Sequence, residues 1–120
     1  MKIFRSFGFA WQGLKICFTA ETNFRIHVLF GSIAILLGIV LGMSATEWMA
    51  VILCIAFVMA MEMLNTAAEK LCDVVYKETH PGIKAVKDIA AGGVLIAAAG
   101  SLITGLIIFL PKIIAYLKSI

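Results

Sequence analysis

Four polar side chains interrupt an otherwise apolar stretch of this 120-residue sequence: Glu62, Asn65, Glu69 and Asp73. On a helix, Glu62 and Glu69 would lie on nearly the same face, separated by about 10.5 Å along the axis. Asn65 and Asp73 fall at nearby angles, so the four groups form one polar stripe. A carboxylate this far inside an apolar helix costs at least about 2.5 kcal/mol on insertion scales. A metal ion, a proton or a basic partner is expected to compensate for that cost.

Two kinds of chemistry fit the stripe. Carboxylates together with lysine are the usual groups for holding a magnesium nucleotide, because their oxygens bind Mg²⁺ and the ammonium binds phosphate. The alternative is a hydrogen-bonded or salt-bridged seam between helices, with Lys70 or Lys87 as the partner. The number of polar groups, with Lys87 and Asp88 across the next turn, favours a functional site. No GxxxxGK[ST] or GxGxxG motif is present, so no familiar soluble nucleotide-binding fold is expected.

The composition indicates an integral membrane protein. Hydrophobic residues make up 62% of the chain and charged residues 14%, against about 45–50% and about 25% in soluble domains. The mean hydropathy is +1.07. Each membrane span needs about 20 apolar residues, so three spans leave room only for short connections and an N-terminal segment. This excludes an additional soluble catalytic domain, and any chemistry must come from residues at the ends of membrane helices.

The N-terminal segment carries one apolar face at helical spacing. The residues of that face are Phe4, Phe7, Trp11, Leu14 and Phe18. Arg5, Gln12 and Lys15 fall largely off the face, so residues 1–22 are predicted to form an amphipathic helix in the membrane interface. A signal peptide is disfavoured, because the apolar run begins only near Ile26 and Glu21 precedes it.

We expect an all-α membrane protein with a single domain over residues 1–120. Its membrane spans are predicted over about 26–43, 48–72 and 87–110. Ser44 or Thr46 can cap the second helix, with Glu47 at its positive end. Small residues on the first and third spans would allow close helix packing.

The distribution of charge predicts the orientation. Eight of the ten basic residues flank the N-terminus or the 70–87 connection, and the 43–48 loop has none. The positive-inside bias therefore places the N-terminus and the 70–87 connection in the cytoplasm. No basic helix carries base-reading or stacking side chains, so nucleic acid is not an expected partner. Cys17, Cys54 and Cys72 lack CxxC spacing and are interpreted as small apolar residues.

Two motifs resemble the signature of the prokaryotic diacylglycerol kinase family. The first, EMLNTAAEKLCD, begins at Glu62, and the second, KAVKDIAAG, begins at Lys84. The resemblance extends to WQGL from Trp11 and ETNFR from Glu21, and so covers nearly the whole chain. It implies a three-span lipid kinase of the bacterial cytoplasmic membrane with a cytoplasmic active site. It further implies a homotrimer whose active sites are shared between protomers, with ATP, Mg²⁺ and a membrane lipid alcohol as ligands.

The resemblance also implies residue roles, position by position. Glu62 corresponds to the general base that accepts the proton of the lipid hydroxyl, while Asn65 and Asp73 orient the reacting groups. Glu21 and Glu69 correspond to the pair that holds Mg²⁺ and thereby ATP. The other positions implied near ATP are Glu78, Thr79, His80, Lys87, Asp88 and, on the surface helix near nucleotide or lipid, Phe9, Gly13 and Arg5.

The lipid is either undecaprenol or diacylglycerol, the substrates of two branches of this family. In the diacylglycerol type known from Gram-negative bacteria, an additional Glu follows the equivalent of Arg25, where this chain has His27. The runs NFRIH at 23–27 and GLIIFLPK at 105–112 look more like the undecaprenol type, which we therefore favour. Two other classes remain open: a small proton- or cation-conducting protein that uses the same carboxylates, and a structural helix-bundle subunit.

Overall fold

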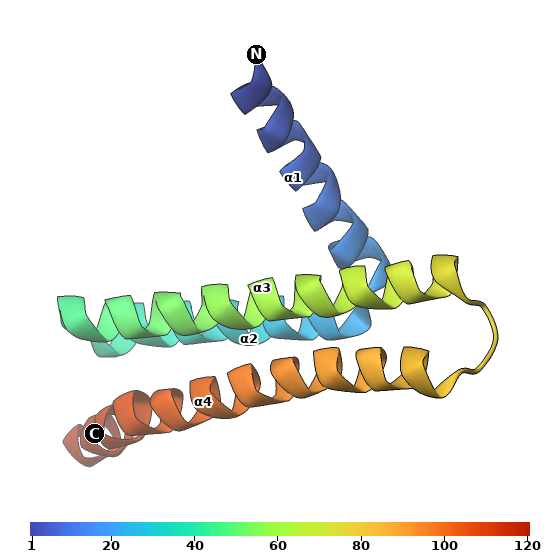
Figure 1. Cartoon of the computed structure of the whole chain (residues 1–120). Coiled ribbons are helices and arrows are strands. Elements are labelled where there is room, and N and C mark those ends of the chain that lie inside the picture. Colours follow the sequence, from blue (N-terminus) through green and yellow to red (C-terminus); the bar gives the residue numbers. More distant parts are fainter.

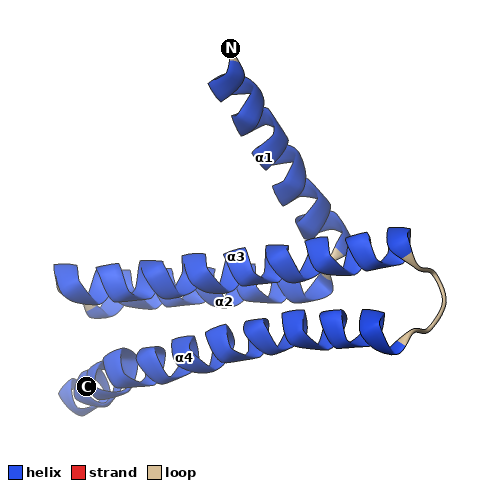
Figure 2. Cartoon of the chain, viewed as in Figure 1, coloured by secondary structure: helices blue, strands red, loops and turns tan.

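The fold consists of four α-helices and no strand (Figures 1 and 2). In the computed structural model, which describes residues 1–120, they are α1 (Lys2–Ala20), α2 (Thr22–Leu41), α3 (Ala45–Val75) and α4 (Pro81–Ser119). The all-α architecture expected from the sequence is confirmed. Helices α2, α3 and α4 run alongside one another, while α1 leaves this bundle near the end that carries the α3–α4 connection (Figure 1).

Three of the helices are long and apolar enough to cross a membrane. They contain 20, 31 and 39 residues, and their mean hydropathies reach 2.2, 2.0 and 2.4 for α2, α3 and α4. Only 10 of the 120 residues are buried, and many large apolar side chains are exposed. In a bilayer these side chains face lipid tails, which are as apolar as the side chains themselves. The chain is therefore a multi-pass membrane protein.

Helices α3 and α4 extend beyond both ends of the spans predicted for them, while α2 begins earlier than predicted and ends at Leu41, two residues before the predicted end. Helix α2 begins at Thr22, and the single residue Glu21 separates it from α1. Helix α4 begins at Pro81 and continues to Ser119, so that Pro111 lies inside it. Proline removes one backbone hydrogen bond, but membrane helices tolerate this because neighbouring groups and local adjustments satisfy the freed carbonyl.

A tight connection joins α2 to α3. Gly42 ends α2 with φ of 77°, a conformation that favours glycine. Ser44, one of the two predicted caps, then begins α3, and together with Glu47 it forms a capping box. Its Oγ accepts a hydrogen bond from the Glu47 backbone N at 3.2 Å, and Glu47 Oε1 accepts one from the Ser44 N at 3.0 Å. The same carboxylate lies 3.0 Å from Lys112 Nζ, which ties the start of α3 to α4.

Arg25 closes the junction between α1 and α2. Its Nη1 donates hydrogen bonds to the carbonyl oxygens of Phe18 at 2.7 Å and Thr19 at 3.1 Å. Its Nη2 donates to Thr22 Oγ1 at 3.2 Å. The last carbonyls of a helix lack partners within the helix and carry partial negative charge. The guanidinium therefore stabilises the end of α1 and helps to fix the direction in which α1 leaves the bundle.

Arg25→Ala is expected to loosen this junction. Loss of the charged donor should lower the local opening free energy by about 1 kcal/mol, or roughly fivefold in exchange rate. Hydrogen exchange measured by mass spectrometry should show faster exchange in the last turn of α1 and unchanged exchange in α3. Lys15→Ala is the matched control, because it removes an α1 cation that instead lies over the Trp11 ring. Equal exchange in the two variants would contradict this role for Arg25.

Candidate active site

The predicted polar stripe lies on one unbroken helix, α3. Exposure rises along it: Glu62 is 4% exposed, Asn65 and Glu69 are half-buried, and Asp73 is exposed. A helix of 31 residues is about 46 Å long, against a hydrocarbon core of about 30 Å. The end of α3 that carries Glu69 and Asp73 can therefore reach the membrane surface while Glu62 lies deeper.

Glu62 is the one buried charged residue of the chain. Its Oε1 lies 3.3 Å from Nε2 of His27 on the neighbouring helix α2. Sequence reasoning missed this contact. The cost of a buried carboxylate predicted a metal ion, a proton or a basic partner, and the basic partners expected were the lysines Lys70 or Lys87. No spacing relates a residue on α2 to one on α3.

Asn65 and Glu69 form the middle of the stripe. Asn65 Nδ2 donates to Glu69 Oε1 at 3.4 Å, while the buried Asn65 Oδ1 has no hydrogen-bond partner. A buried acceptor without a donor is unusual in a folded protein. A hard cation or its bound water would satisfy this oxygen, and Glu69 supplies a carboxylate beside it.

Two exposed ion pairs lie at the polar end of the stripe. Lys87 Nζ on α4 lies 2.8 Å from Asp73 Oδ1 on α3, and Lys84 Nζ lies 2.6 Å from Asp88 Oδ2 within α4. Lys70 makes no ion pair, so Lys87 is the lysine that meets the stripe. Exposed pairs of this kind contribute at most about 1 kcal/mol. Both lysines therefore remain available to an incoming phosphate.

Glu78, Thr79 and His80 lie in the exposed connection between α3 and α4. His80 begins α4, because its Nδ1 accepts a hydrogen bond from the Gly82 N at 2.9 Å. Its ring also packs edge-to-face against Tyr76, with centroids 5.3 Å apart. The connection thus places these three predicted ATP-binding residues at the same end of the bundle as Lys87 and Asp88.

The surface-helix positions are less closely associated with the stripe. Helix α1 approaches α3 near Gly13, where an added Cβ would lie 3.8 Å from Met63 Cε. Arg5 and Phe9 are exposed and belong to the half of α1 that points away from the bundle (Figure 1). Glu21 is half-buried at the α1–α2 junction. Within one chain, no group of three or more His, Cys, Asp or Glu side chains is placed to hold a metal ion.

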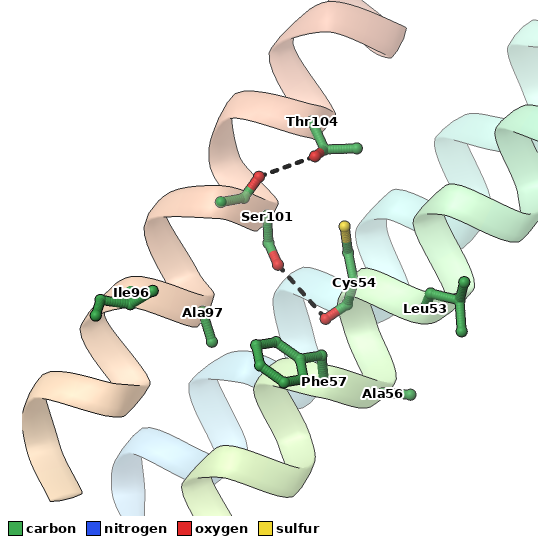
Figure 3. Close-up of a pocket in the computed structure, with 9 residues that line it drawn as sticks. Leu53, Cys54, Ala56, Phe57, Ile96, Ala97, Ser101 and Thr104 are labelled. Atoms are coloured by element: carbon green, nitrogen blue, oxygen red, sulfur yellow. Dashed lines mark hydrogen bonds between the residues drawn. The ribbon is translucent and has the colours of Figure 1, made fainter.

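A groove between α3 and α4 is separate from the stripe (Figure 3). It has a volume of about 730 Å³, and no charged side chain lines it. Ser101 Oγ donates to the Cys54 carbonyl oxygen across it at 3.4 Å, and Thr104 Oγ1 donates to the Gly100 carbonyl oxygen at 2.9 Å. Because these polar groups are occupied within the groove, it offers no phosphate-binding chemistry.

The three cysteines of the chain are free thiols.

Known proteins resemble the chain over almost its whole length. The family model described as prokaryotic diacylglycerol kinase matches residues 8–109. The chain is 38% identical to undecaprenol kinase of Bacillus subtilis (strain 168) over 93% of this chain and 91% of that protein. It is 36% identical to diacylglycerol kinase of Synechocystis sp., over 92% of this chain and 63% of that protein. It is also 29% identical to diacylglycerol kinase of Escherichia coli (strain K12), over 86% and 84% of the two chains.

The protein is a membrane lipid kinase, as its three apolar helices, its carboxylate stripe and these matches together indicate. Enzymes of this class use ATP. The chain belongs to the prokaryotic diacylglycerol kinase family. The ion-conducting and purely structural alternatives are therefore no longer supported.

Proposed function

We propose that this kinase transfers the terminal phosphoryl group of ATP to the primary hydroxyl of undecaprenol, which gives undecaprenyl phosphate. The observation that carries the proposal is the depth of Glu62, at the buried end of a stripe whose other end is exposed. A lipid alcohol stays in the bilayer while ATP comes from water, so the reacting groups must meet at their boundary. Identity of 38% to an undecaprenol kinase and the presence of His27 support undecaprenol as the lipid.

Glu62 serves as the general base in this proposal. Phosphoryl transfer requires positioning and charge neutralisation more than covalent catalysis. The Glu62 carboxylate takes the hydroxyl proton while the lipid oxygen bonds to the terminal phosphorus and the bond to ADP breaks. Asn65 and Asp73, which hold Glu69 and Lys87 by hydrogen bonds, keep the neighbouring groups in place.

Magnesium fits the middle of the stripe. Mg²⁺ is usually held by one or two carboxylates, together with substrate phosphates and water. Glu69 and Glu21 would supply the carboxylates, and the unpaired Asn65 Oδ1 beside Glu69 is an oxygen acceptor of the kind that such a site needs. When bound, the ion neutralises negative charge on the ATP phosphates.

The nucleotide would lie over the polar end of α3 and α4. Lys87 would bind phosphate after leaving Asp73, with Asp88 next to it in sequence. Glu78, Thr79 and His80 border this region from the connecting loop, and Arg5 and Phe9 would complete it from a surface helix.

We also propose a homotrimer with shared active sites and a cytoplasmic N-terminus. Arg5 and Phe9 lie on the part of α1 that points away from its own bundle, so they could reach the stripe of a neighbouring protomer. A Cβ added to Gly92, Gly100 or Gly105 of α4 would meet nothing within 4 Å, which leaves room for a second helix to approach closely. The basic residues around the N-terminus and the α3–α4 connection support the cytoplasmic orientation.

The lipid assignment predicts a preference that can be measured directly. Purified protein in bilayers should phosphorylate undecaprenol with a kcat/KM about tenfold or more above that for a short-chain diacylglycerol. The assay follows ATP consumption and the phosphorylated lipid in parallel, with Glu62→Gln protein as the background control. A preference for diacylglycerol would retain the mechanism but overturn the choice of lipid. Failure of a well-folded trimer to phosphorylate either lipid would contradict the proposed function.

A further inference from the structure

The proposed base has one basic contact, and it is not a lysine. The side chains of Glu62 and His27 are 5% and 24% exposed, and their closest atoms, Oε1 and Nε2, lie 3.3 Å apart. The lysines that form ion pairs do so elsewhere: Lys84 and Lys87 with aspartates at the polar end, and Lys112 with Glu47. No other basic nitrogen lies within ion-pair distance of Glu62.

The surroundings of His27 strengthen its electrostatic interaction with Glu62. Besides contacting Glu62, the imidazole lines a cavity of about 510 Å³ between α2, α3 and α4. Most of the cavity wall is apolar, including Phe30, Val58 and Phe109. Hydrogen bonds are electrostatically stronger in such surroundings than in water, and an unpaired carboxylate is correspondingly costly. At 3.3 Å the two groups are within ion-pair distance but do not form a well-aligned hydrogen bond in this structure. Catalytic hydrogen bonds are often long or poorly aligned before substrate binds and tighten when it does.

We propose that His27 is a positioning residue for the general base. With substrate bound, its Nε2–H donates to Glu62 Oε1, stabilises the carboxylate and leaves the second oxygen directed at the lipid hydroxyl. The proton of the hydroxyl still goes to Glu62, and His27 forms no bond to the substrate. This inference rests on the proposed role of Glu62 and adds a second helix, α2, to the catalytic machinery.

His27→Leu should lower kcat for undecaprenol roughly 10- to 100-fold, because a carboxylate free to rotate spends little time in the productive orientation. The KM for Mg-ATP should stay within about twofold, since the change lies away from the polar end where ATP is proposed to bind. His27→Gln, which retains an N–H donor of similar reach, should keep most of the wild-type kcat. A role confined to packing would not produce this difference between Gln and Leu.

Ser32→Ala is the matched control on the same helix. Ser32 is exposed and its Oγ donates to its own helix, at the Val28 carbonyl oxygen, so this variant should keep wild-type kcat. A wild-type kcat in His27→Leu, or equal losses in His27→Leu and His27→Gln, would overturn the inference. If Glu62→Gln is inactive while His27→Leu is fully active, the inference alone fails. If Glu62→Gln is active, the proposed base itself is wrong.

A second measurement does not depend on activity or on the folding of His27→Leu. The imidazole ¹⁵N signals of His27, assigned by their loss in His27→Gln, should differ between wild-type protein and Glu62→Gln. A hydrogen bond to a carboxylate changes the Nε2 shift, and Gln removes the charge but retains the side-chain length. Identical His27 signals in the two proteins would overturn the inference.

Discussion

Glu62→Gln should reduce phosphoryl transfer to undecaprenol roughly 10²- to 10⁴-fold, the contribution of a well-placed general base. Glutamine has nearly the size of glutamate but cannot accept the hydroxyl proton. The substitution also removes a charge from a site that is 4% exposed, so it should not unfold the helices. The measurement is kcat at saturating Mg-ATP, with circular dichroism and size-exclusion chromatography as checks on folding and assembly.

Glu47→Gln is the matched control for this loss. Glu47 lies at the other end of α3, in the capping box with Ser44, and Gln can still serve in that motif. Its ion pair with Lys112 is partly exposed, so its loss should have little effect. We expect wild-type activity from Glu47→Gln. A folded Glu62→Gln protein that retains most of its activity would exclude Glu62 as the base.

Glu69→Gln and Glu21→Gln should each weaken the binding of Mg²⁺ with ATP. Each should also lower kcat roughly 10²- to 10³-fold, the typical cost of removing one group that stabilises charge in the transition state. Glu69 accepts a hydrogen bond from the amide whose oxygen is unpaired, so its replacement removes the one carboxylate hydrogen-bonded to Asn65. The measurement is a titration with Mg²⁺ at fixed ATP, followed by a titration with ATP at saturating Mg²⁺.

The two titrations distinguish metal binding from general damage to the site. Higher half-saturating concentrations of Mg²⁺ are expected in both variants, with Glu47→Gln again as the unchanged control. Glu62→Gln, in contrast, should bind Mg-ATP normally because its carboxylate lies deeper in the stripe. Unchanged titrations in both Glu69→Gln and Glu21→Gln would show that the proposed metal ligands are wrong.

Local features of the sequence were enough to predict much of this protein. Apolar length and helical periodicity are properties of single segments, so the four helices and three candidate spans could be read without knowledge of their packing. The capping box that begins α3 depends only on the spacing of Ser44 and Glu47. The angular alignment of Glu62 with Glu69 follows from the same helical geometry, and the two motifs around these residues identified the family.

Contacts between helices were decided by the tertiary structure alone. Packing of α2 against α3 brings His27 to Glu62, and the turn after α3 brings Lys87 rather than Lys70 to Asp73. Arg25 reaches back to the carbonyls of α1 because the chain bends at Glu21. Each contact depends on the relative placement of two rigid helices, which no spacing within either helix encodes. The sequence by itself therefore determined which groups were present and on which helix face, and packing determined which groups met.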